Sequence, residues 1–409
     1  MGIPAFYHLP ITRDLKCDLL FENSNKGSIY RKKLSTDRII YGDKFPLETD
    51  CDSINDRGYF PKEALTEAEG NFPVAFARIV YRDYYLLESQ LRVEYAPQNY
   101  YCYVIDSKAD ILFKKRVRNL GKCFNNVFVL DEEVDVRSNG HNMTIAHLAC
   151  LKYLRSYPWK YAILLQNDDI RLRTNAEVVK ILKAFNGAND IAANNPWDYT
   201  FNTNANWTLA ALDLFKNKKL NTLRPLRITK SLVQVSISRA AVDYVFDKLN
   251  IGPFVKKLEL KGYGVDELFW ATLNANEVVN LPGGFTRKYL TRKIQTYTVT
   301  RYTMWKVNKE PLIPCISKYF RNLICVFGVE DLPNLTNLHS MYINKLLPEF
   351  DFAAATCLLE NVYDRTYFPT ENYSFDVEKY TQLRHVRFHK RRMEMWNQNS
   401  EFVESPQVV

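Results

Sequence analysis

No stretch of the 409-residue sequence approaches the roughly 18 consecutive apolar residues that a membrane-spanning helix needs. The first residues, Met1-Gly-Ile-Pro-Ala-Phe6, also lack the basic-then-apolar layout of a signal peptide. Phe6 stands where a myristoylation signal needs Ser or Thr. We therefore expect neither a membrane anchor nor a leader within the chain as given.

Several common catalytic and binding motifs are also missing. The sequence has no GxxxxGKS/T loop, no GxGxxG after its first predicted strand, no HExxH and no GxSxG, which excludes the chemistries that these motifs serve. None of its eight cysteines forms a CxxC pair, so the spacing does not suggest zinc. The formal charge is +9, which is compatible with anionic ligands such as phosphates or nucleotides. No basic stripe is interleaved with aromatic residues, so nucleic acid is not an expected partner.

What the sequence does contain is a regular alternation of strand and helix patterns. Strands are predicted at 74–81, 100–106, 126–131 and 159–166, each followed by a helix pattern, at 84–94, 109–120, 143–157 and 175–185. Near-continuous apolar strands separated by helices predict an α/β fold with a mostly parallel central sheet that helices cover on both faces. Later regular structure is expected as strands at 231–238 and 323–328 and a helix at 240–249, with long loops over 186–226.

Acidic residues follow three of the predicted strands: Asp106, Asp131 and the pair Asp168-Asp169. Parallel sheets bind ligands beyond the carboxyl ends of their strands. Asp106 could hold the ribose or base of a nucleotide there, or it could cap the following helix. Asp168-Asp169 could hold a metal, although adjacent residues on an extended chain point to opposite sides. Fixed Arg or Lys side chains could instead neutralise a leaving diphosphate.

A pair of acids precedes a predicted helix within 261–273. Gly262 and Gly264 loosen the chain, and Asp266 and Glu267 then fall in the first helical turn, where carboxylates complement the helix dipole. Because neighbouring residues on a helix point in different directions, Asp266 can cap the helix while Glu267 faces a cleft. The alternative is that both acids are solvated helix-start residues.

Four segments match, in order, the signature of one family. They are Pro97-Gln-Asn-Tyr-Tyr-Cys-Tyr-Val-Ile-Asp-Ser-Lys-Ala109; Cys123-Phe-Asn-Asn-Val-Phe-Val129 with Trp159-Lys-Tyr161 and Arg173-Thr-Asn175; Asp266-Glu-Leu-Phe-Trp-Ala-Thr272; and Cys315 through Cys325-Val-Phe-Gly328 with Asn344-Lys345. In these segments the chain resembles the core-2/I-branching β-1,6-N-acetylglucosaminyltransferases, whose relatives include the peptide O-xylosyltransferases.

This resemblance implies a GT-A-like nucleotide-sugar transferase fold stapled by disulfides. It further implies an inverting transfer of N-acetylglucosamine, in β-1,6 linkage, from UDP-N-acetylglucosamine to a glycan or glycoprotein acceptor such as a mucin-type O-glycan. The implied reaction needs no cofactor and no metal, and the implied location is the Golgi lumen or membrane. The likeness spans the expected catalytic domain, 72–360. Residues 1–71 are polar and predict a stem or wrapping segment, and 361–409 predict a basic tail whose run at 385–392 forms a solvated helix.

The resemblance also assigns roles to single residues. Glu267 takes the position of the catalytic base, and Asp106 takes the position that contacts the uridine. Arg321 and Lys345 match the cations that neutralise the donor diphosphate, and Trp305 matches a tryptophan that lines the acceptor pocket. As isolated residues, Arg321 and Lys345 could be surface cations and Trp305 could be ordinary core.

The eight cysteines are spread over the whole chain. An even count fits disulfides and an oxidising compartment, but on count alone buried free thiols stay open as an alternative. All eight fall on cysteine positions of the family, so the resemblance implies the pairs Cys17–Cys357, Cys51–Cys123, Cys102–Cys150 and Cys315–Cys325.

Some positions depart from the family pattern. A Gly-Ser pair before the strand near 233 is replaced by Lys230-Ser-Leu232, Val307 stands where an aromatic residue is expected, and one extra residue lies between Cys315 and Cys325. The charged acceptor-binding cluster expected at 200–220 has no clear counterpart. Three alternatives therefore stay open: a UDP-xylose-dependent peptide O-xylosyltransferase, a metal-dependent transferase, and a catalytically inactive glycan-binding relative.

Overall fold

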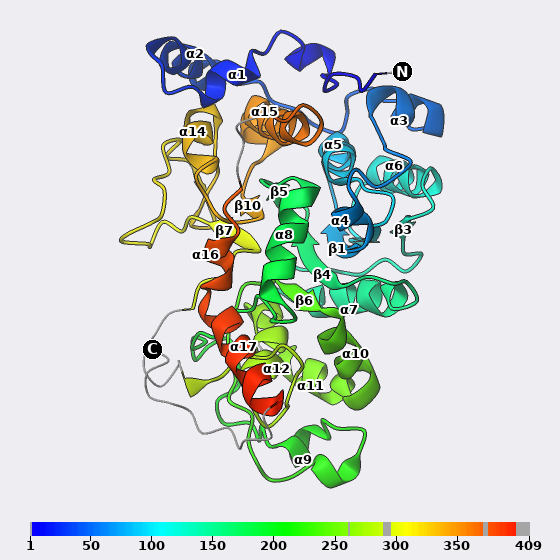
Figure 1. Ribbon diagram of the computed structural model, residues 1–409, viewed down its shortest axis with the longest axis vertical. Helices are drawn as coiled ribbons and strands as arrows, with labels where there is room; N and C mark the ends of the chain where they lie inside the picture. Colours follow the sequence, from blue (N-terminus) through cyan, green and yellow to red (C-terminus); the bar gives the residue numbers. More distant parts are fainter. Residues whose placement is uncertain (1, 261, 289–295, 371–374, 398–409) are drawn as a thin grey trace.

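The computed structural model describes residues 2–260, 262–288, 296–370 and 375–397 (Figure 1). Its central sheet has the strand order β3-β2-β1-β4-β6. The strands are β1 (Val74–Val80), β2 (Tyr100–Ile105), β3 (Val127–Val129), β4 (Tyr161–Gln166) and β6 (Ser236–Ser238). β1 to β4 are mutually parallel and β6 is antiparallel to β4. The prediction of a mostly parallel α/β sheet is confirmed.

Helices cover both faces of this sheet. α5 (Tyr84–Glu94), α6 (Ile111–Lys122) and α8 (Asn175–Phe185) pack on one face, whereas α7 (Met143–Leu154), α10 (Arg239–Lys248) and α12 (Phe269–Ala275) belong to the core on the other. Alternate residues of β1 therefore enter different cores, with Phe76 in one and Ala77 in the other. All seven residues of β1 are buried, which explains why its sequence is apolar without alternation.

A second, smaller sheet and a hairpin lie beside the central sheet. β5 (Ile170–Arg171), β10 (Tyr342–Asn344) and β7 (Arg301–Thr303) form the sheet, and β8 (Phe320–Arg321) pairs with β9 (Ile324–Cys325). The strand expected over 323–328 is therefore too long. Asn322 and Leu323 have φ values of 51° and 65°, as the two central residues of a tight hairpin turn require.

The remaining expectations on regular structure are met with shifted boundaries. β6 covers only the end of the strand expected over 231–238, and α10 takes the helix expected after it. The long loop region 186–226 contains only short helical turns, at α9 (Leu209–Leu212) and η2 (Lys218–Leu220). The other elements are α11 (Ile251–Leu258), η3 (Val265–Glu267), η4 (Val329–Asp331) and α14 (Leu332–Leu335).

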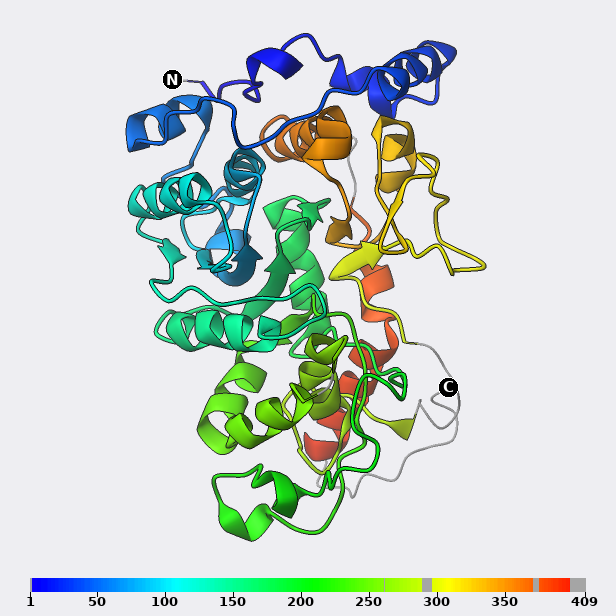
Figure 2. The same ribbon diagram turned by 180° about the vertical axis from the view of Figure 1, so that it is seen from behind.

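The N-terminal segment lies across one end of the molecule, beside α15 (Pro348–Tyr367) (Figures 1 and 2). It consists of short helices: η1 (Pro10–Thr12), α1 (Cys17–Phe21), α2 (Asn25–Thr36), α3 (Cys51–Arg57) and α4 (Glu67–Gly70). The disulfide Cys17–Cys357 joins it to α15 across 340 positions of sequence. All four disulfides pair as the resemblance implied.

The C-terminal segment contains α16 (Glu378–Thr381) and α17 (Arg384–Asn397), and its last residues, 398–409, lie outside the described residues. The expectation of a solvated helix at 385–392 is wrong, because α17 buries one face: His385, Val386, Phe388 and His389. His385 Nε2 lies 3.2 Å from the Asp190 carboxylate. Arg387 and Lys390 of this run are exposed, whereas Arg391 and Arg392 are half-buried. None of the described helices is long and apolar enough to span a bilayer.

Candidate active site

The topology of the central sheet reverses between β1 and β4. The chain runs outward from β1 to β2 and β3 and then returns to the other side of β1 as β4, and open α/β sheets bind ligands at the carboxyl ends of strands at such a point. Arg82 follows β1 there and donates to the Asp168 carboxylate beyond β4 at 3.0 Å. Asn167 ties the two strand ends, because its side-chain oxygen accepts from the backbone N–H groups of Tyr81 and Arg82 at 3.0 and 3.3 Å.

Three cations and two carboxylates gather at this point. Lys345, directly after β10, places its ammonium 3.9 Å from Asp168. Arg321, the last residue of β8, donates to Glu349 at 2.8 Å, and Arg82 donates to the other oxygen of Glu349 at 2.7 Å. The structure therefore brings together Arg321 and Lys345, as the resemblance implied.

Arg82 is the cation that the sequence analysis missed. The signal that could have found it was its place directly after the first predicted strand, which is the argument that singled out Asp106 after the second. Burial opposes its charge, but Asp168 and Asp83 outweigh this effect and raise its pKa.

Lys345 and two carboxyl groups beside the cations also have shifted pKa values. Burial lowers the pKa of Lys345, and the positive charge of Arg321 adds to this shift while Asp168 opposes it. Burial likewise raises the pKa of Asp83 to about 7, with Arg82 opposing and Asp43 adding. Burial opposes charge on Glu349 too, but the hydrogen bond from Arg82, a backbone hydrogen bond and the charges of Arg82 and Arg321 together outweigh it and lower the pKa of Glu349. The site is thus strongly charged and partly shielded from solvent, as a pocket for a phosphate group would be.

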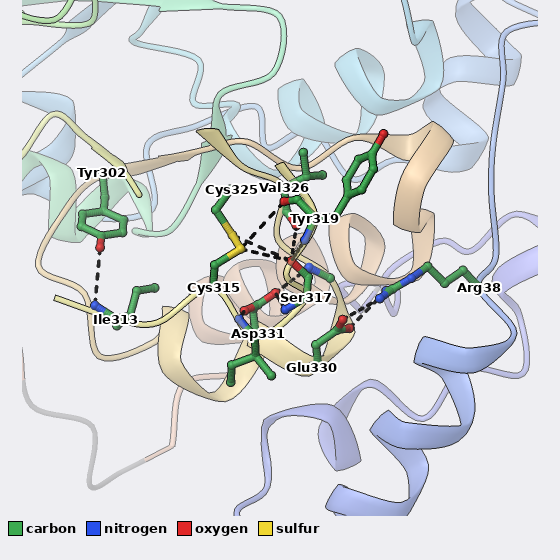
Figure 3. Close-up of a disulfide and its surroundings, with 12 residues drawn as sticks. Arg38, Tyr302, Ile313, Cys315, Ser317, Tyr319, Cys325, Val326, Glu330 and Asp331 are labelled. Carbon is green, nitrogen blue, oxygen red and sulfur yellow. Dashed lines mark hydrogen bonds and ion pairs between the residues drawn. A yellow bond between two sulfur atoms is a disulfide. The ribbon is translucent and has the colours of Figure 1, made fainter. Parts of the chain in front are cut away.

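The hairpin that carries Arg321 is held from several sides (Figure 3). Its base is closed by Cys315–Cys325. The Asp331 carboxylate accepts from the backbone N–H groups of Ile316 at 2.6 Å and Gly328 at 2.9 Å. Neighbouring Glu330 is paired with Arg38 of the N-terminal segment at 2.5 Å. The hairpin is therefore closed at its base and linked through η4 to the N-terminal segment.

Trp305 lies against the same hairpin. It follows β7, forms a β-bridge with Ile324 and is partly buried. Because β7 runs parallel to β10, with Thr303 opposite Asn344, Trp305 and Lys345 leave neighbouring strands in the same direction. The structure thus groups Trp305 with Arg321 and Lys345.

Asp106 lies at the carboxyl end of β2 with only 8% of its surface exposed. Its carboxylate accepts from the backbone N–H of Lys108 at 3.0 Å and from the ammonium of Lys108 at 2.8 Å. The alternative that Asp106 caps the following helix is wrong, because Asp110 is the N-cap of α6 and accepts from Leu112. Asp106 therefore lies at the end of β2 as a buried carboxylate paired with Lys108.

Asp168 and Asp169 point to different partners, as their adjacency on an extended chain predicted. Asp168 faces Arg82 and Lys345. Asp169 is fully buried, lies 3.4 Å from Arg301 and accepts from Gln234 at 3.0 Å. Each carboxylate is already compensated by protein cations or amide donors.

The turn that carries Glu267 is a 3-10 helix, η3, directly before α12. Its backbone is fixed from two sides, because Gly264 donates to Asn139 O at 2.7 Å and Ser231 donates to Glu267 O at 2.9 Å. The capping role predicted for Asp266 is wrong: Leu268 is the N-cap of α12 and no side chain caps it. Burial instead raises the pKa of Asp266 to about 7, and the charge of Glu267 adds to the shift.

Glu267 itself forms an ion pair that the family pattern did not predict. Its Oε2 lies 2.6 Å from the ammonium of Lys230, and each of the two side chains is 17% exposed. Lys230 is part of the segment that departs from the family, Lys230-Ser-Leu232. The alternative that Glu267 is a solvated helix-start residue is therefore wrong.

The Glu267 turn and the cation cluster are connected through the residues before β6. Because β6 is antiparallel to β4, the residues that lead into β6 lie at the carboxyl end of β4, next to Asp168 and Asp169. In this segment Ser231 contacts the Glu267 turn and Gln234 contacts Asp169. A single short segment thus joins the proposed base to the end of the sheet that carries the cations.

Comparisons with known proteins give the family of this chain. The sequence model described as Branch: Core-2/I-Branching enzyme matches residues 74–336, more than half of the chain. This chain belongs to the core-2/I-branching enzyme family. It is a glycosyltransferase.

Similar proteins from three mammals show how far the likeness extends. A bovine (Bos taurus) β-1,3-galactosyl-O-glycosyl-glycoprotein β-1,6-N-acetylglucosaminyltransferase is 28% identical over 335 residues, which cover 78% of this chain and 76% of that protein. A Rattus norvegicus protein with the same name followed by the number 3 is 28% identical over 358 residues, which cover 85% of this chain and 80% of that protein. The counterpart from Ovis aries is 27% identical over 380 residues, covering 89% and 85%.

Proposed function

We propose that this glycosyltransferase transfers N-acetylglucosamine, in β-1,6 linkage and with inversion, from UDP-N-acetylglucosamine to a glycan acceptor such as a mucin-type O-glycan. The observation that carries the proposal is the cluster of Arg82, Arg321 and Lys345 at the switch point of the sheet. The transferred sugar and the linkage are those in the names of the similar proteins. The proposed location is the secretory pathway, in the Golgi.

The cation cluster would hold the diphosphate of the donor. Arg321 and Lys345, together with Arg82, would stabilise the negative charge that develops as UDP leaves. In the structure these cations are paired with Glu349 and Asp168, so the diphosphate would replace carboxylate contacts that are already in place. Asp106, at the neighbouring strand end, would contact the uridine.

Glu267 would act as the general base. An acceptor hydroxyl attacks C1 of the donor sugar from the face opposite the diphosphate, and its proton passes to the Glu267 carboxylate. The new C1–O bond forms as the bond from C1 to the phosphate oxygen breaks, and its electron pair leaves with UDP. One carboxylate is sufficient because the leaving diphosphate needs no proton, unlike the leaving group of a glycosidase.

We also propose that the transfer needs no metal. Protein cations surround the place where the diphosphate would lie, and they can supply the charge that a divalent ion supplies elsewhere. Asp168 and Asp169, the two carboxylates that could have held an ion, are instead paired with Arg82, Lys345 and Arg301.

A donor screen with and without EDTA tests this function. UDP release would be measured for several UDP-sugars, including UDP-xylose, with a β-1,3-galactosyl mucin-type disaccharide glycoside or a serine-containing peptide as acceptor. We expect transfer from UDP-N-acetylglucosamine to the disaccharide, unchanged in EDTA. Transfer from UDP-xylose to the peptide would identify a peptide xylosyltransferase, and loss of activity in EDTA would identify a metal-dependent enzyme. Glycan binding without UDP release from any donor would identify an inactive relative.

A further inference from the structure

An exposed aromatic surface lies beside the proposed base. Trp197 and Tyr199 stack, with ring centroids 5.6 Å apart and planes 15° apart, and they remain 51% and 58% exposed. Single exposed aromatic residues are ordinary on protein surfaces. Two stacked rings with half of their surface open to solvent form a flat apolar platform, the aromatic platform below, which needs an explanation.

Lys230 joins this aromatic platform to Glu267. Its ammonium lies 3.5 Å from the centroid of the Trp197 ring and 2.6 Å from Glu267 Oε2. The cation is therefore held between an aromatic face and a carboxylate, both of which attract it. Any group that approaches Glu267 Oε2 to give up a proton has to compete with this ammonium.

The backbone around the aromatic platform is fixed by hydrogen bonds. Asn194 and Lys230 exchange both of their backbone hydrogen bonds, at 3.0 and 2.8 Å. Thr200 donates to Trp197 O from its backbone N–H at 2.9 Å and from its hydroxyl at 2.7 Å. The rings are thus presented on an ordered turn next to the base, and ordered rings lose little conformational entropy when a ligand binds.

We propose that Trp197 and Tyr199 bind a pyranose ring of the acceptor glycan, and that a hydroxyl of this bound sugar displaces the Lys230 ammonium from Glu267. The apolar C–H face of a pyranose matches a flat aromatic surface, while its hydroxyls reach the polar groups at the edge of that surface. The inference rests on the proposed function, since it gives that reaction its acceptor subsite. Lys230 acts as a positioning residue, and its displacement frees Glu267 to accept the proton.

The first test compares acceptor binding between variants. Trp197→Ala and Tyr199→Ala should each raise the acceptor KM by about threefold to tenfold, the usual range for one aromatic contact, and leave the donor KM unchanged. Tyr199→Phe should bind as the wild type does, because it keeps the ring. Tyr153→Ala, at an exposed tyrosine (43%) near the C-terminus of α7, is the matched control and should change neither KM. An unchanged acceptor KM in both alanine variants would overturn the subsite.

The second test compares Lys230→Met with Lys230→Arg. The ammonium of Lys230 lies 2.6 Å from Glu267 Oε2, so in Lys230→Met the acceptor hydroxyl has no cation to displace. The acceptor KM of Lys230→Met should therefore fall, while kcat, which reports the enzyme with both substrates bound, stays unchanged. Lys230→Arg keeps the cation and should behave as the wild type does. A lower kcat with an unchanged acceptor KM in Lys230→Met would overturn the displacement.

Calorimetric titration separates failure of this inference from failure of the proposed function. The β-1,3-galactosyl disaccharide glycoside would be titrated into wild-type protein and into Trp197→Ala. Binding that weakens in Trp197→Ala, together with no transfer from any donor, would leave the subsite standing and reject the enzymatic function. Transfer by the wild type with equal affinity for both proteins would reject the subsite alone.

Discussion

Glu267 is the residue on which the proposed chemistry depends. Glu267→Gln keeps the size of the side chain and removes its basicity, so transfer should fall by about 10²–10⁴-fold, the usual contribution of a general base. The affinity for UDP, measured calorimetrically, should be unchanged because Glu267 is not part of the cation cluster. Transfer at the wild-type rate would reject Glu267 as the base.

Lys345 gives the corresponding prediction for the proposed diphosphate site. Lys345→Met keeps most of the buried aliphatic stem and removes the charge, so kcat should fall by about 10²–10³-fold, as when one preorganised electrostatic group is lost, and UDP should bind more weakly. Lys309→Met, at an exposed lysine in the loop after β7, removes the same charge outside the cluster and serves as the control. Equal losses in the two variants would indicate a general effect of charge.

Asp83 gives a pH dependence of stability with a defined sign. Its pKa is raised from 3.8 to about 7, so the folded protein holds this proton more tightly than the unfolded chain does. The stabilisation of the folded state by this bound proton is fully present below about pH 4 and is lost as the pH rises through about 7. Asp83→Asn does not titrate, and asparagine tolerates the positive φ of 59° at this position.

Urea unfolding of both proteins between pH 4 and 8 measures this effect. The free energy of unfolding of Asp83→Asn, relative to wild type, should rise across that range by roughly 1–4 kcal/mol. A difference that stays constant with pH would show that Asp83 does not titrate in this window.

At the residue scale, the resemblance supplied assignments that Arg321, Lys345 and Trp305 did not carry alone. The structure places Arg321 and Trp305 on or against the hairpin β8–β9 and Lys345 beside Asp168, and their roles stay predictions. The sequence did not single out Arg82, whose contacts with Asp168 and Glu349 cross 86 and 267 positions of sequence. The capping role of Asp266 failed because a 3-10 turn, rather than the α-helix itself, contains both acids.

At the scale of elements, we expect opening the disulfide at the base of the hairpin β8–β9 to affect catalysis more than stability. Cys315→Ser with Cys325→Ser opens a loop of only 10 positions, which corresponds to about 3 kcal/mol of loop entropy. The same change loosens the base of the hairpin that carries Arg321. We expect the donor KM to rise strongly, as measured by steady-state kinetics, while urea unfolding changes moderately.

The pair Cys17–Cys357 is the natural comparison. It closes a loop of 340 positions, for which the same relation gives about 5–6 kcal/mol, and neither cysteine lies in the proposed site. Cys17→Ser with Cys357→Ser should therefore lower the free energy of unfolding more and the donor KM less. The reverse order of effects would contradict the structural role of this disulfide.

The elements most accurately predicted were the long parallel strands and their helices, because strands buried on both faces leave a continuous apolar run in the sequence. The second sheet was not predicted, since β5 has two residues and β7 and β10 have three each, too few to show a period. The prediction of a solvated helix at α17 was wrong because it rested on the many basic residues of this segment. The packing of the helix depends on four buried residues, two of which are histidines.

At the scale of the whole molecule, the division into a stem at 1–71, a catalytic domain at 72–360 and a tail at 361–409 stays a prediction. The N-terminal segment packs closely on the main body, with Leu20 fully buried and Arg38 paired with both Glu330 and Asp351. The two contacts of Arg38 join positions that are 292 and 313 residues apart. They could not be predicted from local patterns, because only the cysteine positions hinted at them.

The Cys17–Cys357 link also fixes an order of events during synthesis. A ribosome adds about 5–20 residues per second, so roughly 20–70 seconds separate the appearance of Cys17 from that of its partner 340 positions later. Throughout that interval α15 is not yet available for the N-terminal segment to pack against. The six other cysteines that emerge in between could form non-native disulfides with Cys17. The last cysteine to be translated therefore forms its disulfide with one of the first segments to have emerged.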